Sequence, residues 1–269
     1  MVDKTDDDKS NKILNASFNQ DGSCFAIGTD VGFKIYSTSP FRDNFERNLE
    51  GGIGYCEMLN RCNILALVGG GRSPKYSPNK VIIWDDHQSK VVSELRFTSY
   101  VRNIKLKRDK LIVVCDQKVY LFNLLNFQNI DTIDSFDNTK GLIAVSNDPK
   151  ITVIAFPDKG QGAVKVKLYD KDMQINIQAH ESSLACISLN FDGTLLATAS
   201  DKGTLIRIFN TETSNLLQEV RRGTEKATIY SIAFNPSSSL LATSSDRGTI
   251  HIFSISDANK ALKEGKSLE

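Results

Sequence analysis

The sequence predicts an all-β protein assembled from repeated units of about 40–45 residues. Each unit contains a short strand of β-branched and large apolar residues that ends on an aromatic residue. Six such strands follow one another: Phe33–Tyr36, Val81–Trp84, Val119–Phe122, Val166–Tyr169, Ile206–Phe209 and Ile250–Phe253. Subtraction of residue numbers places their last aromatic residues 48, 38, 47, 40 and 44 positions apart. This period, with several strands in each unit, is typical of a β-propeller of the WD-repeat type.

Turn sequences inside the units support the same fold. Turn-forming residues recur early in three units, at Phe18–Ser23, Asn190–Thr194 and Asn235–Ser238. A second turn ends on glycine, where we expect positive φ, at Thr29–Gly32, Ser200–Gly203 and Ser245–Gly248. Trp84-Asp85 is a literal WD dipeptide. The fifth unit has one more residue than the sixth just before its aromatic strand, which suggests a β-bulge that re-aims Arg207.

The number of units sets an expectation for the whole chain. Six blade signatures are visible and sixteen residues follow Phe253, by subtraction from 269. This indicates a seven-bladed design whose last blade is absent from this chain, with a six-bladed ring as the alternative. We expect a disordered polar N-terminus over 1–12, the propeller over 13–255, and a tail over 256–269 that could begin a loop of blade six.

Composition limits the classes of function. Apolar residues make up 40% of the chain, charged residues 24%, and the formal net charge is +1, as in an ordinary soluble globular protein. Bulk charge therefore draws the protein neither to membranes nor to nucleic acid, and any anion binding must come from local clustering. The five cysteines show no metal-type spacing, which fits a reducing compartment. No apolar run approaches the roughly 20 residues that span a bilayer, so we expect any membrane contact to be peripheral.

No catalytic arrangement is visible in the sequence. The three histidines, His87, His180 and His251, lack an accompanying acidic cluster, which argues against a metal site and against a nucleophile–base pair. Gly69–Gly71 is not a phosphate-binding loop, because no Gly-Lys-Ser/Thr follows it. We expect no enzyme activity, no cofactor, no nucleic-acid partner and a monomer.

The adjacent arginines Arg221 and Arg222 are the candidate functional centre. Neighbouring side chains of an extended segment point to opposite sides, so we expect each arginine to face a different pocket. Two similar phrases, Ala197–Thr204 and Ala242–Thr249, flank the pair and offer hydroxyls, a glycine and a basic residue. Such groups suit phosphate oxygens. The alternative is that the arginines are solvated or form ion pairs with acids such as Glu219 and Glu225.

Arg221-Arg222-Gly223 between two Ser-Asp-basic-Gly-Thr turns resembles the PROPPIN family of phosphoinositide-binding β-propellers. Further matching phrases are Phe18–Asp21, Ala66–Gly71, Pro78–Asp86, Ala179–Glu181 and Gly203–Phe209. The resemblance favours the subgroup with short inter-blade loops. It implies a seven-bladed propeller that binds phosphatidylinositol 3-phosphate and phosphatidylinositol 3,5-bisphosphate at two rim pockets. Val220 stands where the family usually has Phe or Leu, a change that preserves the strand.

The resemblance also implies a set of residues for each pocket. The first set is His180, Thr198, Ser200, Gly203, Thr204, Arg207 and Arg221. The second set is Arg222, Ser245, Arg247, Thr249 and His251. For His180, a bracing role in the hydrogen-bond network of its blade is an equal alternative. Asn19 and Asp21 are interpreted as turn residues, in a region where the resemblance places contacts to a lipid-transfer protein.

The function that the resemblance implies is that of a non-enzymatic effector. It would act in autophagy and in vacuolar or endosomal protein transport, with an autophagy lipid-transfer protein as a possible partner. The protein would be cytoplasmic and peripheral on vacuolar, endosomal or pre-autophagosomal membranes. The alternative is a WD-repeat scaffold whose arginines bind acidic peptide motifs.

Overall fold

The structure is a computed structural model, and it describes residues 11–255. The expectations for 1–10 and for the tail over 256–269 lie outside the described residues. The chain divides into two compact units, Met1–Leu111 and Ile112–Glu269, and each is described by itself. Within residues 11–255, regular structure consists of β-strands and one 3-10 turn, η1, at Tyr169–Lys171.

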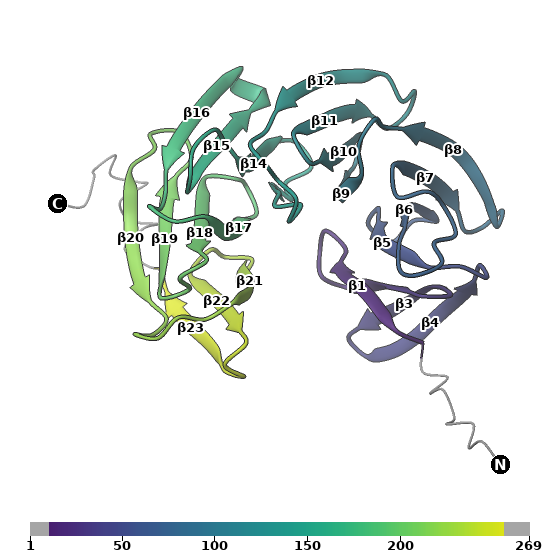
Figure 1. Ribbon diagram of the computed structural model, residues 1–269, viewed down its shortest axis with the longest axis horizontal. Coiled ribbons are helices and arrows are strands. Elements are labelled where there is room, and N and C mark those ends of the chain that lie inside the picture. Colours follow the sequence, from purple (N-terminus) through teal and green to yellow (C-terminus); the bar gives the residue numbers. More distant parts are fainter. Residues whose placement is uncertain (1–10, 256–269) are drawn as a thin grey trace, which may run out of the picture. The chain divides into compact units, whose positions relative to one another are not determined.

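The first unit contains two complete antiparallel sheets, each with its four strands in chain order (Figure 1). The strands of the first sheet are β1 (Ile13–Phe18), β2 (Cys24–Thr29), β3 (Gly32–Thr38) and β4 (Phe41–Asn48). Those of the second sheet are β5 (Ile53–Met58), β6 (Ile64–Gly69), β7 (Lys80–Asp85) and β8 (Lys90–Arg96). The third sheet follows the same order, and the boundary between the units falls within its second strand. Its strands are β9 (Val101–Lys107), β10 (Lys110–Cys115), β11 (Lys118–Asn123) and β12 (Asn129–Asp134).

The second unit continues the same plan with three further sheets (Figure 1). The fourth sheet is formed by β13 (Ala144–Val145), β14 (Val153–Pro157), β15 (Ala163–Leu168) and β16 (Met173–Gln178). The fifth is formed by β17 (Leu184–Leu189), β18 (Leu195–Ser200), β19 (Leu205–Asn210) and β20 (Leu216–Arg221). The sixth has three strands among the described residues: β21 (Ile229–Phe234), β22 (Leu240–Ser245) and β23 (Ile250–Ser254). The fold class is therefore the all-β propeller type, with six blades in this chain.

The repeated aromatic strand is the third strand of every sheet, as the sequence predicts. In the fourth sheet the aromatic residue lies just outside this strand: β15 ends at Leu168, and Tyr169 begins η1. The turn residues also lie between the expected strands, and Gly203 and Gly248 have φ of 64° and 73°. Glycine adopts this left-handed conformation without the steric cost that a Cβ brings.

The expected bulge at Arg207 is wrong. The pairing of β18 with β19 is regular and places Thr198 opposite Arg207, just as β22 and β23 place Thr243 opposite His251. The extra residue of the fifth unit is accommodated in the turn: six residues lie between the paired Ala199 and Ile206 of the fifth sheet, and five lie between the paired Ser244 and Ile250 of the sixth. A register shift does occur on the other side of β19, between Ile208 and Phe209 in its pairing with β20. Three other sheets have the same shift between their third and fourth strands.

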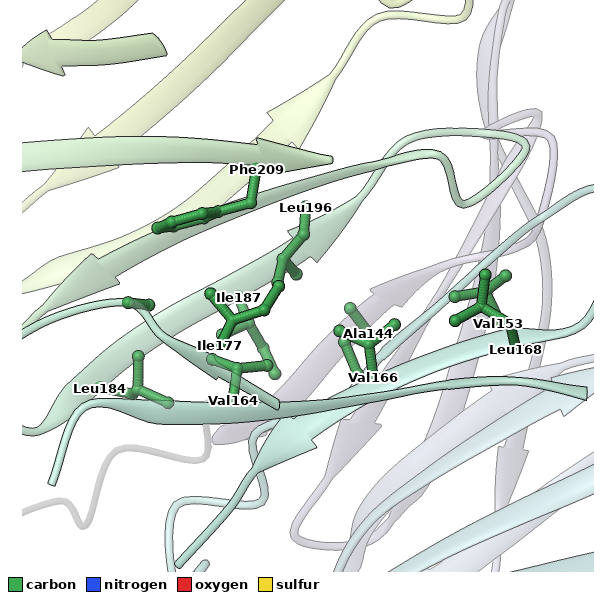
Figure 2. Close-up of a cluster of buried hydrophobic side chains, with 12 residues drawn as sticks. Ala144, Val153, Val164, Val166, Leu168, Ile177, Leu184, Ile187, Leu196 and Phe209 are labelled. Carbon is green, nitrogen blue, oxygen red and sulfur yellow. The ribbon is translucent and has the colours of Figure 1, made fainter. Parts of the chain in front are cut away.

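Apolar side chains pack between consecutive sheets and form the core. Figure 2 shows the cluster between the fourth and fifth sheets, where Val164 and Val166 of β15 pack with Leu196 of β18 and Phe209 of β19. The opposite face of the fifth sheet packs on the sixth through Ile206 and a set of further apolar residues. Because both faces of the fifth sheet are packed against neighbouring sheets, its polar side chains gather at the strand ends and at the rim.

The outward face of the sixth sheet is exposed. Ile250 and Ile252 are 72% and 66% exposed, whereas Ile206 and Ile208 at the same positions of β19 are 0% exposed. The first sheet likewise carries exposed aromatic residues, Phe18 and Phe41. Exposed apolar residues that lie close together are typical of surfaces that contact another element or molecule.

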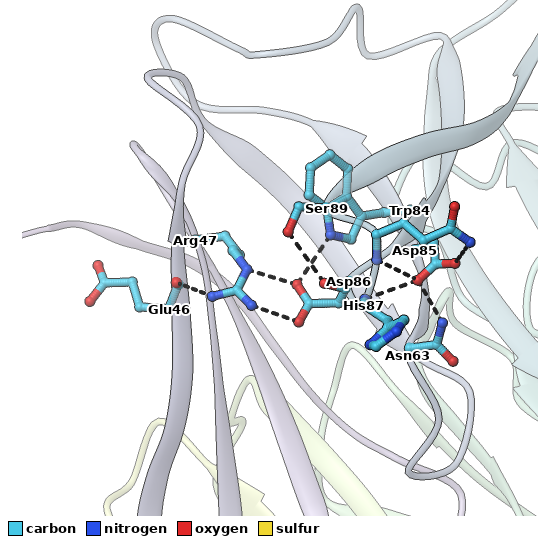
Figure 3. A network of polar contacts seen from close by, with 9 residues as sticks. Glu46, Arg47, Asn63, Trp84, Asp85, Asp86, His87 and Ser89 are labelled. Carbon is cyan, nitrogen blue, oxygen red and sulfur yellow. Dashed lines mark hydrogen bonds and ion pairs between the residues drawn. The ribbon is translucent and has the colours of Figure 1, made fainter.

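A polar network joins the first sheet to the second (Figure 3). Arg47 of β4 donates from Nε and Nη2 to the two carboxylate oxygens of Asp86, both at 2.8 Å, and the Trp84 indole donates to Oδ1 of the same carboxylate at 3.2 Å. Asp85 accepts from Asn63 and caps the following turn. Asp86 thus accepts from Arg47 of the first sheet and from Trp84 of the second, and it ties the two blades together.

Candidate anion-binding site

The arginine pair lies where β20 ends and the loop to the sixth sheet begins. Arg221 is the last residue of β20 and is exposed, whereas Arg222 is only 8% exposed. Within residues 11–255 the Arg221 guanidinium has no hydrogen bond or ion pair. Arg222 donates from Nε to the carbonyl of Gly203 at 2.8 Å and from Nη2 to the carbonyl of Glu225. The two side chains therefore have separate surroundings, as their alternation along an extended segment requires.

The first arginine group is the first predicted set, and most of its members lie on the face of the fifth sheet that packs toward the fourth. The register places Thr198, Arg207 and Glu219 in one cross-strand row. The adjacent row contains Ser200, opposite Leu184 of β17, and Arg221, opposite Leu205. His180 joins from the preceding loop through a 3.0 Å contact between its Nε2 and the Thr198 hydroxyl.

Arg207 is held by two acceptors. Its Nε donates to the Glu219 carboxylate at 2.8 Å, and its Nη1 donates to the carbonyl of Ala179 at 2.7 Å. The Arg207 side chain is 30% exposed and that of Glu219 38%. The guanidinium is therefore fixed in direction while part of it remains open to solvent.

His180 is buried in the same group. Burial lowers the pKa of its imidazole below the ordinary value of 6.5, and the positive charge of Arg207 lowers this pKa further. In the hydrogen bond between the neutral ring and the Thr198 hydroxyl, either group can be the donor, depending on the tautomer of the ring. This placement is compatible with both expectations for His180, as a bracing residue and as a member of the group.

Gly203 has a structural role that its sequence phrase alone does not reveal. A Cβ at this position would lie 1.9 Å from the carbonyl oxygen of Ala227. The backbone of the turn and that of the following loop are therefore in close contact, and Arg222 bonds to the same glycine carbonyl. The side chain of Arg222 therefore joins this turn to the loop 222–228, and we call this contact between turn and loop the seam.

The second arginine group is the second predicted set: Arg222, Ser245, Arg247, Thr249 and His251. Ser245 is buried, and its hydroxyl accepts from the backbone N–H of Arg247 at 3.4 Å. Arg247 donates to the carbonyl of Lys226 at 2.8 Å and pairs with the Glu225 carboxylate at 3.3 Å. The Thr249 hydroxyl contacts His251 at 3.2 Å. His251 is half-buried.

Glu225 connects the two arginines of this group. Its backbone carbonyl accepts from Arg222, and its carboxylate pairs with Arg247. The ion pairs weighed from sequence thus exist, but with other arginines: Glu219 pairs with Arg207 and Glu225 with Arg247. Sequence reasoning also left out Lys202 and Lys226, which are exposed in the turn and the loop beside the groups. For Lys202 the available signal was its place as the basic residue of the first Ser-Asp-basic-Gly-Thr phrase.

Asn19 and Asp21 lie in the turn between β1 and β2. Asn19 is 4% exposed, accepts from the Cys24 N–H, and donates to Ser23 and to the Asn60 carbonyl. Asp21 is exposed and accepts from the hydroxyl and the N–H of Ser23, bonds that lower the pKa of its carboxyl. Both residues therefore form hydrogen bonds within the turn, as expected of turn residues. Of the two, only Asp21 is exposed to solvent.

Two searches of the described residues are negative. Residues 11–255 contain no group of three or more His, Cys, Asp or Glu side chains placed to hold a metal ion. Within the same range no helix has the length and apolar character required to cross a membrane.

Fold and site define a class of protein: a WD-type β-propeller with paired arginine groups on consecutive blades. A sequence model of the PROPPIN family matches residues 13–268. The chain belongs to the PROPPIN family.

Individual relatives agree. The chain is 41% identical over 247 residues to "Autophagy-related protein 18e" of Arabidopsis thaliana, covering 91% of this chain and 66% of that protein. It is 40% identical over 245 residues to "SVP1-like protein 2" of Neurospora crassa, covering 91% of this chain and 56% of the relative. The chain thus spans less than two thirds of the length of these two proteins.

Solved structures show the same fold. Kluyveromyces lactis Hsv2 superposes with a TM-score of 0.80 at 28% identity, covering 97% of this chain and 79% of that one. A complex of KlAtg21 with the coiled coil of AgAtg16 gives 0.77 at 28% identity, covering 91% of this chain and 82% of the other.

Proposed function

We propose that this chain is a non-enzymatic phosphoinositide-binding effector that binds peripherally to membranes through its two arginine groups. The observation that carries the proposal is the repetition of one arrangement on consecutive sheets. Ser200 and Ser245 occupy equivalent positions, as do the pairs Thr198–Arg207 and Thr243–His251. Arg221 and Arg222 lie between the two groups.

The side chains present suit a phosphate monoester. Arginine offers planar donors that match phosphate oxygens, and hydroxyl and backbone N–H donors complete an anion site. Arg221 contributes an exposed guanidinium that has no protein partner among residues 11–255, and Arg207 and Arg247 are partly exposed. Two weak sites on one membrane would act together through effective concentration, so neither site needs high affinity alone.

Family membership and the names of the relatives support a finer proposal. The proposed ligands are phosphatidylinositol 3-phosphate and phosphatidylinositol 3,5-bisphosphate. The proposed setting is autophagy and vacuolar or endosomal protein transport, with the chain cytoplasmic and peripheral on vacuolar, endosomal or pre-autophagosomal membranes. The near-neutral formal charge of +1 supports recruitment by specific headgroups, because it gives bulk anionic lipid little to attract.

Vesicle flotation tests the proposal. Vesicles with 3-phosphorylated inositides should recruit the protein, and vesicles with phosphatidylserine at equal charge should not. Arg221→Ala should lower recruitment, whereas Lys90→Ala, an exposed cation of the second sheet, should leave it unchanged. Equal recruitment by both vesicle types, or none by either, would count against the proposal.

A second candidate function, scaffolding through acidic motifs, is favoured by a cleft in the first unit. This cleft of about 500 Å³ is lined by the buried apolar residues Met58 and Leu65, by the basic residues Arg42, Arg61 and His87, and by Asp86. Basic groups together with apolar side chains suit an acidic segment with an apolar anchor. The solved complex of KlAtg21 with a coiled coil is consistent with protein binding in the family. An autophagy lipid-transfer protein is the proposed partner, and loss of its binding in Arg42→Glu with lipid binding retained would support the scaffold role.

A further inference from the structure

Each arginine group contains an acidic side chain bonded to one of its arginines. Glu219 pairs with Arg207 at 2.8 Å in the first group, and Glu225 pairs with Arg247 at 3.3 Å in the second. We propose that these two glutamates are built-in counter-ions that lower the affinity of each group for phosphate. The inference rests on the proposed function and names residues that set its strength.

The geometry at Glu219 carries the argument furthest. Its carboxylate accepts a hydrogen bond from Nε of Arg207, and the two residues lie opposite each other in one cross-strand row. Arg221 follows two residues later, so its side chain leaves the same face of β20 about 7 Å along the strand. The negative charge of Glu219 therefore lies next to both arginines that would bind a phosphate in this group. Within the first arginine group and its neighbour Glu219, one carboxylate offsets one of two guanidinium charges.

Glu219 is one of two acceptors that hold Arg207. The Ala179 carbonyl accepts from Nη1 at 2.7 Å, and this bond does not involve the Glu219 side chain. Neutralising Glu219 as glutamine keeps a side-chain oxygen that can still accept from Nε. The substitution thus removes charge while it retains geometry, which separates a counter-ion from a positioning residue.

Glu225 should have the same effect in weaker form. Its side chain is 77% exposed and its distance to Arg247 is longer, so solvent screens its charge more strongly. The backbone carbonyl of Glu225, which accepts from Arg222, is unaffected by a side-chain change. We therefore expect Glu219 to lower the affinity for phosphate more than Glu225 does.

Calorimetric titration with the soluble headgroup inositol 1,3-bisphosphate tests the inference. In low salt, E219Q should bind about threefold more tightly than the unchanged chain, as expected for removing one charge near an anion in a water-like medium. E225Q should show a smaller gain, and both gains should shrink at 0.5 M salt, with a Debye length of about 4 Å. E212Q is the matched control: Glu212 pairs with Lys171 in the turn at the opposite end of β19, so it changes net charge equally but away from the site.

The outcomes separate this inference from the proposed function. If the unchanged chain binds the headgroup and E219Q binds it equally or more weakly, the counter-ion role is wrong and the lipid-binding function stands. A gain of the same size in E212Q would also overturn the role, because it would reflect net charge alone. If the folded, unchanged chain binds neither the headgroup nor vesicles that contain phosphatidylinositol 3-phosphate, both proposals fail together.

Discussion

Arg221 and Arg222 are adjacent in the chain and lie in opposite environments. Arg221 is exposed without a protein partner among residues 11–255, whereas Arg222 is buried and bonds to the carbonyls of Gly203 and Glu225. The pair therefore differs in what it contributes to the folded state. One guanidinium is free for a ligand, and the other already joins a hairpin turn to the following loop.

This difference predicts unequal costs of truncation. Arg222→Ala leaves the buried Gly203 carbonyl and the partly buried Glu225 carbonyl without their charged donor, and it should lower the free energy of unfolding by about 2–4 kcal/mol. Arg221→Ala removes an exposed side chain and should change it by less than about 0.5 kcal/mol. Urea unfolding midpoints measure both values. Equal midpoints for the two variants would contradict the assignment of Arg222 to the seam.

The same difference affects how lipid binding is interpreted. A loss of recruitment in Arg222→Ala combines altered structure with the loss of a ligand contact, whereas a loss in Arg221→Ala reports on the ligand. Arg221 is therefore the cleaner probe of the first arginine group. Recruitment should be compared at equal amounts of folded protein, as judged by circular dichroism.

His180 predicts a pH dependence of stability. Burial, and then the charge of Arg207, lowers the pKa of His180 below 6.5 in the folded state. Protons then bind the unfolded chain more readily, so stability falls as pH decreases from about 7 through 6.5 toward the folded-state pKa. The contribution of one such group cannot exceed about 1.4 kcal/mol per pH unit.

Urea unfolding at pH 7.5, 6.5 and 5.5 checks this prediction. His180→Gln should flatten the fall relative to the unchanged protein, and the exposed His87→Gln should not. The comparison stops above the range in which most carboxylates titrate. An identical pH profile for the unchanged protein and His180→Gln would show that His180 is solvated rather than buried.

Asp86 predicts a loss of stability without a loss of lipid binding. Asp86→Asn keeps the volume of the side chain but replaces one acceptor of Arg47 with a donor, so part of the network in Figure 3 breaks. We expect a loss of about 1–3 kcal/mol, because the Asp86 side chain is only 12% exposed. Glu212→Gln, at an exposed ion pair, should cost about 0–1 kcal/mol. Thermal unfolding of the two variants gives the comparison.

The strands and turns could be predicted from sequence because their causes are local. β-branched residues followed by an aromatic, and glycine at a position of positive φ, depend on a few adjacent residues. The extra residue of the fifth unit could not be assigned in the same way. Chain length alone does not distinguish a longer turn after Ser200 from a bulge at Arg207, and only the regular pairing of β18 with β19 decides it.

The partners of the arginines could not be predicted for a related reason. Glu219 faces Arg207 because β19 and β20 pair in one particular register, which is not visible in either strand alone. Arg222 meets Gly203 because the loop 222–228 returns against the turn, a path set by tertiary packing. Residue types therefore indicated an anion site, and cross-strand geometry determined which charges are free.

The two Ser-Asp-basic-Gly-Thr turns supply a matched pair of substitutions. Gly203 and Gly248 have nearly the same positive φ, 64° and 73°, so alanine costs about 1–2 kcal/mol at either position through backbone strain. They differ in available space: a Cβ on Gly203 would lie 1.9 Å from the Ala227 carbonyl oxygen, whereas a Cβ on Gly248 would meet no atom of residues 11–255 within 4 Å.

Gly203→Ala should therefore destabilise the protein by at least about 3 kcal/mol, because strain adds to a clash with backbone that must shift. Gly248→Ala should cost only about 1–2 kcal/mol. Urea unfolding of both variants measures the difference. The shift should also weaken the bond from Arg222 to the Gly203 carbonyl, so Gly203→Ala and Arg222→Ala together should cost less than the sum of the two. Additive costs would mean that the turn and the arginine are energetically independent, contrary to the contact between them.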